Sequence, residues 1–420
     1  MENTPPWVQI AQGIYIGTIL TLDLPRSIEA FQGIPYAKPP IGNLRFRPPE
    51  KVEVSSNTYD ATRLGPAAPG KQLLPGSAMT YSEDCLTVNI YRVARVDVEN
   101  ATGLLPVVVY FHAGAFNRGT SSSHNTASML AWSSQPFVAV SFNYRLGALG
   151  FLPSTATANQ GLLNLGLKDQ IALLDWVQEN IASFGGNPLE VTLMGLSAGA
   201  HSQQFAEFLC EVGSPENASD DEIFDFLRSV PLEVITQAQE TIFDRYNTSL
   251  RWAFQPVIDG EIIRRPPLDT WRLGLWHKMP ILTGFCRNEG SLYVNKSMQT
   301  SSQFNDFFGN LLPKLSKADN NQLKELYPDP TMQPRCQYVE TRSGVGAQYK
   351  RVEAAYAHYA YVAPVRQTAN FASAAMTQPV YLYQWAAVSS ELNGARHGDN
   401  KRVSQSNSKF YTGQTSLGPV

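Results

Sequence analysis

Apolar residues gather in five short runs that predict buried strands. They span residues 106–111, 137–143, 191–194, 279–285 and 379–385, and the first two are rich in β-branched side chains. A nearly continuous apolar run of this length is typical of a strand that is covered on both faces. Such strands occur in parallel sheets that have helices on both sides. The chain therefore carries the strand pattern of an α/β protein.

Between the strands, the apolar residues follow a helical period. The strongest example is 165–184, where they recur every three or four positions and form one stripe; it consists of Leu167, Ile171, Leu174, Val177, Ile181 and Phe184. Two glycines then end this helix. Further helices are expected at about 198–211, at 220–229 and through much of 300–375. Strands that alternate with helices favour a mostly parallel, doubly wound sheet with loops at the strand ends.

Size and charge narrow the class further. The chain has 420 residues, of which 43% are hydrophobic, so it can bury a large core. No internal boundary is evident, and we predict a single domain over residues 1–420. The net charge is −3 and no basic patch stands out, which argues against a nucleic-acid partner. Oligomeric state is not predicted.

The cellular compartment is predicted from two sequence features, membrane-spanning segments and a secretory signal. No apolar run reaches the roughly 18 residues that a membrane helix needs. The N-terminal residues also lack the basic and apolar segments of a secretory signal. We therefore expect a cytoplasmic protein without a membrane span, and secretion is the alternative if a leader is missing from this sequence.

The cysteines suggest neither a metal site nor a disulfide framework. Their spacing fits no zinc site, and four in so long a chain are too few for a scaffold of disulfides; they are Cys85, Cys210, Cys286 and Cys336. We expect small buried hydrophobic side chains, and we expect neither a metal nor a cofactor.

The apolar run at 191–194 leads into a motif for acyl transfer. Residues 195–199 read G-L-S-A-G, which matches the nucleophile elbow G-x-S-x-G. In this elbow a strand turns sharply into a helix and holds the serine at the tip, and the glycines remove side chains that would collide. The preceding helix, turn and strand supply the context that the motif requires. We predict that Ser197 is a nucleophile; the alternative is a buried serine in a glycine-rich turn.

A serine nucleophile needs a histidine to take its proton. In this fold class the chain order is serine, acid, histidine, so only four of the six histidines qualify. His201 lies too near the serine in sequence, and the surroundings of His277 and His358 favour structural roles. His397 lies in a glycine-flanked loop just beyond the last predicted strand, where a base is expected.

The sequence signals for the acid and for the oxyanion donors are weaker than those for the serine and the histidine. Glu289 follows the strand at 279–285, and Asp259 is its rival, so the residues alone leave this choice open. The oxyanion hole requires the N–H after the nucleophile and N–H groups from the loop after an earlier strand. These would be the N–H groups of Ala198, Gly114 and Ala115.

Taken together, these motifs resemble the type-B carboxylesterase and lipase family, the cholinesterase-like α/β-hydrolases, and especially its fungal esterases. Residues 184–199 fit the long signature around the serine, F-G-G-x4-V-T-L-x-G-L-S-A-G, and residues 83–90 fit a second signature, E-D-C-L-T-V-N-I. Residues 31–40, 143–147 and 169–170 are also similar to the family.

The resemblance covers about residues 13–399 and implies an α/β-hydrolase fold, a mostly parallel central sheet flanked by helices. It implies a triad of Ser197, Glu289 and His397, with Gly114, Ala115 and Ala198 around the oxyanion. It also implies two structural ion pairs, Arg45 with Glu83 and Arg145 with Asp169.

The chain departs from the family pattern in several places. Ala113 stands where the family usually has glycine, so a positive φ there would strain the loop. Ala115 is of less concern because its N–H is unchanged, and Leu196 stands where the family often has glutamate. Compared with the family pattern, we expect the chain to lack a strand after the nucleophile helix and a C-terminal piece, and we expect an atypical polar tail over residues 400–420.

These features predict a serine carboxylic-ester hydrolase that works through an acyl-enzyme. The expected substrate is an ester or lactone of a small apolar metabolite, such as one of fungal secondary metabolism. One alternative is a truncated or weakly active paralogue, motivated by the two missing pieces. A second is a non-catalytic binding protein, although the chain keeps the nucleophile. Acyl transfer to an alcohol would use the same residues as hydrolysis.

Overall fold

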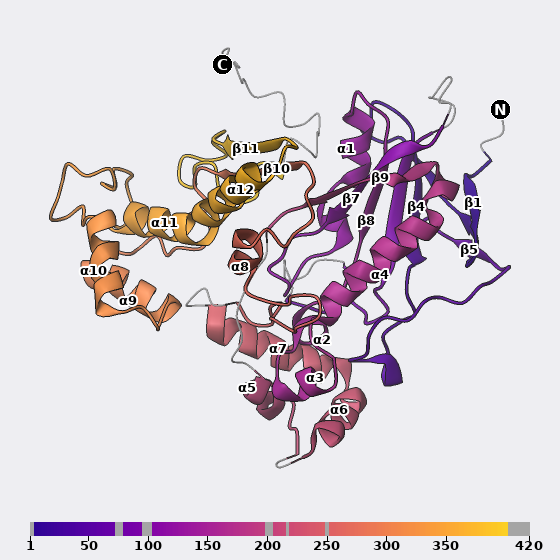
Figure 1. The fold of residues 1–420 in the computed structure, drawn as a ribbon, viewed down its shortest axis with the longest axis horizontal. Coiled ribbons are helices and arrows are strands. Elements are labelled where there is room, and N and C mark those ends of the chain that lie inside the picture. Colours follow the sequence, from indigo (N-terminus) through magenta and orange to yellow (C-terminus); the bar gives the residue numbers. More distant parts are fainter. Residues whose placement is uncertain are drawn as a thin grey trace. The chain divides into compact units, whose positions relative to one another are not determined.

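The computed structural model divides into two compact units, shown in Figure 1. It describes residues 4–71, 79–94, 103–197, 205–215, 218–247 and 252–401. The first unit holds the described residues up to 247 together with 252–259, and the second holds those from 260 onward. The single domain expected from the sequence stays a prediction, and the two units are described separately.

The first unit is built on a six-stranded sheet in the order β3-β4-β6-β8-β7-β9. Its pairs from β3 to β8 are antiparallel, whereas β7 pairs in parallel with both β8 and β9. The sheet is therefore mixed and not mostly parallel as expected from the sequence, and its parallel part is the one that ends at the predicted nucleophile. The strands are β3 (Thr18–Leu20), β4 (Ile28–Pro35), β6 (Thr87–Val93), β7 (Leu105–Phe111), β8 (Val138–Phe142) and β9 (Gly186–Gly195).

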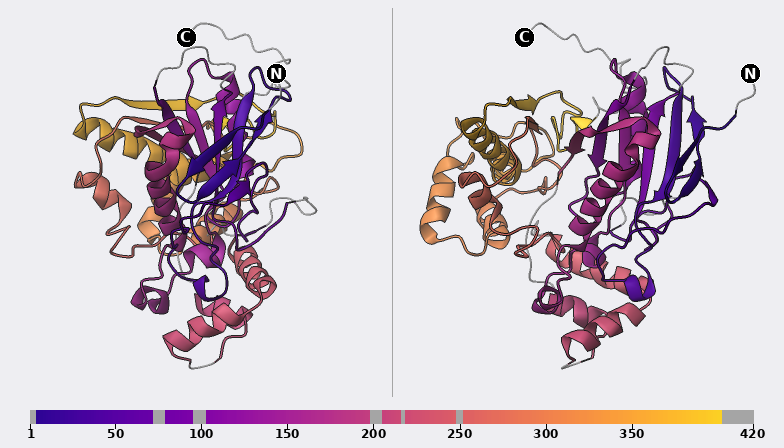
Figure 2. Two further views of the ribbon diagram at one scale, coloured as in Figure 1. Left: turned by 90° about the vertical axis from the view of Figure 1, so that its right-hand side faces the viewer. Right: turned by 45° about the vertical axis from the view of Figure 1, so that its right-hand side comes forward.

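Helices cover both faces of this sheet, as the apolar strands require. Alternate residues of β8 face opposite sides: Val140 packs in the core that includes Leu173 of α4, and Ala139 packs with Leu130 of α1. Figure 2 shows α4 in magenta along one face of the sheet. The helices of this unit are α1 (Thr126–Trp132), α2 (Gly147–Phe151), α3 (Thr155–Asn159), α4 (Leu165–Asn180), α5 (Phe205–Glu211), α6 (Asp220–Ser229) and α7 (Leu232–Asn247).

A small sheet and several 3₁₀ turns complete the description of the first unit. A small sheet has the order β1-β2-β5, with strands β1 (Trp7–Ile10), β2 (Gly13–Ile16) and β5 (Thr58–Asp60). The 3₁₀ turns are η1 (Gly42–Leu44), η3 (Ser121–Ser123) and η4 (Ile181–Phe184).

The apolar stripe of α4 differs in part from its prediction. Ile171 is 44% exposed, whereas Leu173 and Trp176 are buried in its place. The helix turns its polar Asp169 inward as well, because that carboxylate is fully buried against Arg145. The periodicity of apolar residues alone cannot predict that a carboxylate is buried on the same face of the helix.

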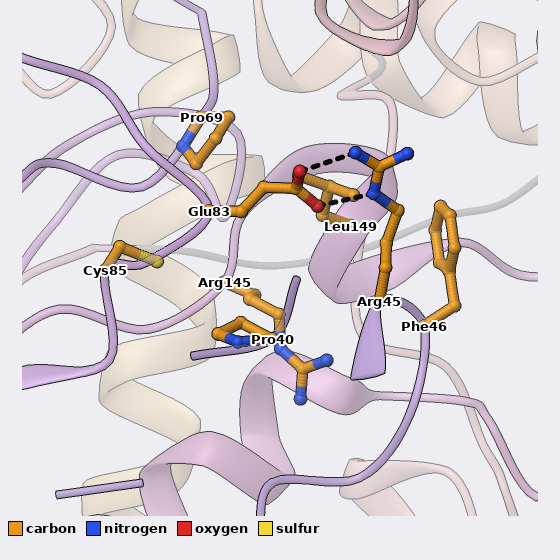
Figure 3. Close-up of a pocket in the computed structure, with 8 residues that line it drawn as sticks. All are labelled: Pro40, Arg45, Phe46, Pro69, Glu83, Cys85, Arg145 and Leu149. Carbon is orange, nitrogen blue, oxygen red and sulfur yellow. Dashed lines mark hydrogen bonds and ion pairs between the residues drawn. The ribbon is translucent and has the colours of Figure 1, made fainter. Parts of the chain in front are cut away.

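Both ion pairs implied by the resemblance are formed, and both are buried in the first unit. Arg45 donates from Nε and Nη2 to the two carboxylate oxygens of Glu83, at 2.6 Å each (Figure 3). Arg145 pairs in the same two-pronged way with Asp169, at 2.8 and 2.6 Å. The space between these side chains does not admit a water molecule, so it is packing around ion pairs rather than a substrate pocket.

The second unit carries one parallel pair of strands, β10 (Ile281–Cys286) with β11 (Val380–Trp385). Within the described residues, no strand lies between β9 and β10. The helices of this unit are α8 (Pro267–Arg272), α9 (Ser301–Leu311), α10 (Lys317–Leu326), α11 (Tyr349–Ala357), the π-helix η5 (His358–Val362) and α12 (Ala363–Ala375). Helices α9 and α11 share an apolar core that includes Phe304, Phe308, Val352 and Tyr356.

All four cysteines are free. Cys85 and Cys286 are buried as expected, but Cys210 is exposed on α5, which corrects the expectation for that residue. Among the described helices, none is long and apolar enough to cross a membrane.

Candidate active site

Ser197 lies two residues beyond the end of β9, on the parallel part of the first sheet. Its φ is 62°, a left-handed value that is uncommon for a residue with a side chain. Backbone strain of this kind is typical of nucleophile elbows, in which a strand turns sharply toward a helix. Ser197 is also exposed. The geometry on the strand side thus fits an elbow, while Ala198 lies outside the described residues.

A Cβ at Gly195 would meet Phe111 of β7 at 3.5 Å, which is ordinary van der Waals contact. Among the described residues, Gly195 is therefore not required by a clash with the neighbouring strand. The collision expected within the turn itself involves residues from 198 on, which lie outside the described residues.

The predicted oxyanion loop follows β7 in the same unit. Within the described part of the chain, the N–H groups of Gly114 and Ala115 donate no hydrogen bond. The carbonyl of Ala115 is held by two amides, Nδ2 of Asn117 and Nε2 of Gln255, both at 2.6 Å. Fixed carbonyls and unused N–H groups are what an oxyanion hole needs, because its donors must be in place before charge develops.

The strain in this loop falls on different residues from those expected. Ala113 does not have a positive φ, whereas Gly114 has 137°, Ala115 has 53° and Phe116 has 59°. The concern raised for Ala113 is therefore wrong, and Ala115 is the alanine in a left-handed conformation. Such a conformation costs on the order of 1 kcal/mol, which the two amide contacts to the Ala115 carbonyl offset.

Gly114→Ala should disable this loop. A Cβ at Gly114 would lie 1.8 Å from the carbonyl oxygen of Arg118, so the backbone must move. Displacing one oxyanion donor typically costs a factor of about 10² to 10³ in kcat, and we expect that loss in steady-state ester hydrolysis.

Gly185→Ala is the matched control for this variant. Gly185 has a φ of 86°, but a Cβ there has no atom within 4 Å. It introduces similar backbone strain away from the loop and should leave kcat within about twofold of wild type. Equal effects of the two substitutions on kcat would contradict the role of the loop.

His112 begins this loop and supports it rather than acting as a base. Its ring stacks on Tyr144 with centroids 4.4 Å apart, and its carbonyl accepts a hydrogen bond from the Tyr144 hydroxyl at 3.0 Å. Burial lowers the pKa of His112 to about 4, so the ring is neutral at physiological pH. Its position before the serine excludes His112 as the base in the expected chain order, but its structural role was missed.

The other half of the predicted machinery lies in the second unit. Glu289 follows β10 and is 4% exposed. Its Oε1 accepts a hydrogen bond from the N–H of Cys286 at 2.6 Å, and its Oε2 lies 2.5 Å from Nδ1 of His397. A carboxylate on Nδ1 holds the proton there and makes Nε2 the basic nitrogen, which is the arrangement of a catalytic dyad.

Two loops meet to form this pair. Asn288 donates its N–H to the carbonyl of Ala395 at 2.8 Å, and its Oδ1 accepts from the N–H of Ala395 at 3.2 Å. Asn288 also forms an isolated parallel bridge with Arg396. The backbone next to Glu289 is thus tied directly to the backbone next to His397.

Asp259, the rival acid, has a structural role in the first unit. Its Oδ2 accepts a hydrogen bond from Nδ2 of Asn164 at 2.7 Å. The same Asn164 bonds both backbone groups of Val257, at 2.8 and 2.9 Å. The carboxylate that lies on Nδ1 of His397 is that of Glu289 and not that of Asp259.

His358 is placed as the sequence suggests, because its Nδ1 lies 2.8 Å from the hydroxyl of Tyr327. His277 is exposed, which corrects the expectation of a structural role for that residue. His201 lies outside the described residues. In the described ranges, no group of three His, Cys, Asp or Glu side chains could hold a metal ion.

Two tyrosines beside His397 were missed by the sequence analysis. The ring centroid of Tyr361 is 4.6 Å from that of His397, and that of Tyr293 is 5.8 Å away. Tyr361 lies in the π-helix η5, just before Pro364. Proline has no backbone N–H and cannot donate a hydrogen bond to the preceding helical turn, and the wider turn of a π-helix accommodates this missing bond. The only sequence signal was this proline within a helical segment.

Comparisons with known proteins agree with the fold and the motifs. The sequence model of the carboxylesterase family matches residues 4–208 and 201–416. Secreted lipase 4 of Gibberella zeae is 31% identical over 399 residues, which cover 85% of this chain and 71% of that protein. A carboxylic ester hydrolase of Bombus ignitus is 32% identical, over 72% of this chain and 61% of its own length.

A solved structure shows the fold. The crystal structure of Aspergillus niger EstA superimposes with a TM-score of 0.79 at 25% identity, covering 95% of this chain and 81% of that one. The α/β-hydrolase fold predicted from the sequence is confirmed. This chain spans only part of its relatives, about three fifths of the Bombus protein.

The expectation of a cytoplasmic location is wrong. The Gibberella relative, which matches most of this chain, is named a secreted lipase. The expectation depended on the absence of a signal at the start of the printed sequence, and such an absence does not determine the compartment.

Proposed function

Because this chain belongs to the carboxylesterase family, we propose that it hydrolyses carboxylic esters with Ser197 as nucleophile, His397 as base and Glu289 as acid. The observation that carries the proposal is the bond between Nδ1 of His397 and Oε2 of Glu289, because it prepares a histidine to take a proton. The left-handed backbone of Ser197 supports the assignment of this residue as the nucleophile. We place this activity outside the cell, following the secreted relative.

In the proposed acylation step, Oγ of Ser197 attacks the ester carbonyl carbon and its proton passes to Nε2 of His397. The oxyanion accepts hydrogen bonds from the N–H groups of Gly114, Ala115 and Ala198. The carbon–oxygen bond to the alcohol then breaks, and the alcohol leaves with the proton from His397. Glu289 stays ionised and stabilises the imidazolium that forms between these transfers.

Deacylation repeats the same chemistry with water. Nε2 of His397 takes a proton from water, and the hydroxide oxygen adds to the acyl carbon. When the tetrahedral intermediate collapses, the bond to Oγ of Ser197 breaks and His397 returns the proton to that oxygen. The carboxylic acid is released and the enzyme is restored. An alcohol in place of water would give acyl transfer by the same residues.

We propose an ester or lactone of a small apolar metabolite as the substrate. The rings of Tyr361 and Tyr293 flank His397 and offer apolar contact beside the base. A panel of p-nitrophenyl esters of increasing acyl length tests this preference, with competing alcohols added to detect acyl transfer. A polar acyl group hydrolysed faster than an apolar one of equal size would contradict the apolar preference.

A fluorophosphonate probe tests the nucleophile. We expect one covalent adduct that peptide mass spectrometry places on Ser197, and no adduct in Ser197→Ala. Ser302→Ala, which changes an exposed serine of α9, should label like wild type. A sample that unfolds cooperatively and forms no adduct would contradict the proposed function and favour a non-catalytic binding protein.

A weakly active paralogue is the second candidate. It is favoured by the absence of a strand between β9 and β10 in the described residues. It predicts an adduct on Ser197 that forms slowly, together with a broad thermal transition. Rapid labelling and a sharp transition would exclude it.

A further inference from the structure

The oxyanion loop makes a left-handed turn at Ala115 and Phe116. Both residues have positive φ values, 53° and 59°. The carbonyl of Gly114 accepts hydrogen bonds from the N–H groups of Asn117 and Arg118, at 3.0 Å each, so the segment is one turn of helix with the opposite hand. The first N–H groups of a helical turn have no acceptor within it and point away from it together. Here these are the N–H groups of Ala115 and Phe116.

Every carbonyl of this turn accepts a hydrogen bond. That of Phe116 accepts from the N–H of Gly147 at 2.8 Å, and that of Ala115 accepts from the two side-chain amides described above. Within the described residues, by contrast, the N–H of Phe116 donates no hydrogen bond, like those of Gly114 and Ala115. A turn whose carbonyls are bonded and whose successive N–H groups are unused is a concave site for an anion, known as a nest.

The side chain of Gln255 fixes the peptide group that carries the Phe116 N–H. In a planar trans peptide the carbonyl and the N–H point in opposite directions, so a bond to the Ala115 carbonyl also sets the direction of the Phe116 N–H. Gln255 is 1% exposed, and its Nε2 donates to that carbonyl at 2.6 Å. Because Nε2 also lies 3.4 Å from the carbonyl of Ala253, the nitrogen of this amide is the atom that faces the two oxygens.

Gln255 supplies an anchor outside the loop. Asn117, the other donor to the Ala115 carbonyl, belongs to the loop and moves with it. Gln255 belongs to a separate segment, and its neighbour Phe254 is fully buried against Phe208 of α5, with ring centroids 5.8 Å apart. A shift of the loop therefore has to break the bond to Gln255.

We propose that the N–H of Phe116 is a further donor to the oxyanion, beside the donors named above, and that Gln255 is the positioning residue that directs it. This inference rests on the proposed hydrolysis. Negative charge develops on the carbonyl oxygen when Oγ of Ser197 adds to the ester, and a donor fixed in advance stabilises this charge without reorganisation. Gln255 makes no contact with the reacting atoms in this proposal.

An alkyl trifluoromethyl ketone tests the donor directly. Oγ of Ser197 adds to its carbonyl carbon, the serine proton passes to Nε2 of His397, and the ketone oxygen becomes an oxyanion. In protein labelled with ¹⁵N-phenylalanine, the amide proton of Phe116 should move downfield when this adduct forms, because it gains a charged acceptor. Phe116→Tyr assigns the resonance by removing it from the spectrum. An adduct that leaves the Phe116 resonance in place would overturn the proposal.

Gln255→Leu tests the positioning residue, because it keeps an apolar side chain of similar size and removes the donor. We expect kcat to fall by about 10- to 100-fold, less than the roughly 10²- to 10³-fold typical of losing a donor outright, with KM changed by less than about threefold. The Ki of the trifluoromethyl ketone should rise by the factor by which kcat/KM falls, because both quantities measure stabilisation of the oxyanion. A glutamine that only stabilises the fold would leave Ki unchanged.

Gln32→Leu is the matched control. Gln32 is a half-buried glutamine of β4 whose Nε2 donates to the Tyr91 hydroxyl at 3.1 Å, and its loss should leave kcat/KM and Ki at wild-type values. Wild-type kcat/KM and Ki in Gln255→Leu would overturn the positioning role. Should that variant fail to fold, Gln255→Met replaces it, because methionine keeps the length of the side chain and also lacks the donor.

The outcomes separate this inference from the proposed function. Hydrolysis together with an unmoved Phe116 resonance refutes only the inference. A wild type that shows no hydrolysis, no ketone adduct and no fluorophosphonate label refutes the proposed function and the donor role with it. The contact of Gln255 is still decided in the free protein, because the ¹⁵N shift of Phe116 depends on the hydrogen bonds that the Ala115 carbonyl accepts. Gln255→Leu should move that shift, and an unchanged shift would overturn the contact.

Discussion

Replacing Ser197 or His397 with alanine should lower kcat for ester hydrolysis by about a million-fold. Nucleophile and base act as a unit in serine hydrolases, so losing either one removes nearly the whole contribution of the triad. For the same reason, the double variant should be no slower than each single variant. Stopped assays with an activated ester, after active-site titration of the wild type, measure losses of this size.

Glu289→Gln refines this prediction. Glutamine can present its amide N–H to Nδ1 of His397 and so favour the wrong tautomer, and a loss of about 10⁴ in kcat is expected. His277→Ala, at an exposed histidine of the same unit, is the control and should retain wild-type kcat. A His397→Ala variant with more than about one hundredth of wild-type kcat would contradict the assignment of the base.

Asp169→Asn should reduce the free energy of unfolding by about 3 to 5 kcal/mol, because it leaves the charge of Arg145 buried and unpaired. Asp169 is fully buried and accepts from the Arg145 side chain and from its backbone N–H at 3.0 Å. Arg145 also donates to the carbonyl of Arg47 at 2.7 Å. The guanidinium therefore cannot turn to solvent without breaking several contacts.

Urea denaturation measures this effect. Glu179→Gln breaks the pair of Glu179 with Lys51, whose side chains are largely exposed, and should cost no more than about 1 kcal/mol. The contrast between a buried and an exposed pair in the same unit isolates desolvation as the cause. A loss below about 1 kcal/mol in Asp169→Asn would show that the Arg145 charge is accommodated in another way.

The sequence predicts the fold best where one physical signal dominates. The apolar runs locate the central strands because burial on both faces leaves no polar alternation. The run at 191–194 underestimates β9, which extends over Gly186–Gly195, because its first part contains asparagine and proline. In the register of its pair with β7, Gly186 lies opposite Leu105, and the register then shifts before Val191.

For the candidate site, the sequence could predict only which residues have the expected chain order and which follow a predicted strand. Glu289 and His397 were predicted because each follows a strand, with Asp259 left as the rival acid and Glu289 favoured only by the resemblance. Their contact could not be derived without a structure. Tyr361 and Tyr293 were missed because their position beside His397 is purely spatial.

Backbone conformation was the property that the sequence predicted least well. The family pattern directed attention to Ala113, although the positive φ values fall on Gly114 and the two residues after it. Alanine has the same φ preferences at every position, so a motif cannot state which alanine the surrounding structure forces to a positive φ.

The amide contact on Ala115 sets an order of events during folding. Gln255 binds the Ala115 carbonyl across 140 residues of chain, and Asn117 binds the carbonyl of the neighbouring Phe254. Closing a loop of that length carries an entropic cost that short-range pairing of β7 with β8 does not. During synthesis, the ribosome releases β9 and its serine well before Gln255. β9 can thus form while the Ala115 carbonyl still lacks its contact with Gln255 and has only the local contact with Asn117.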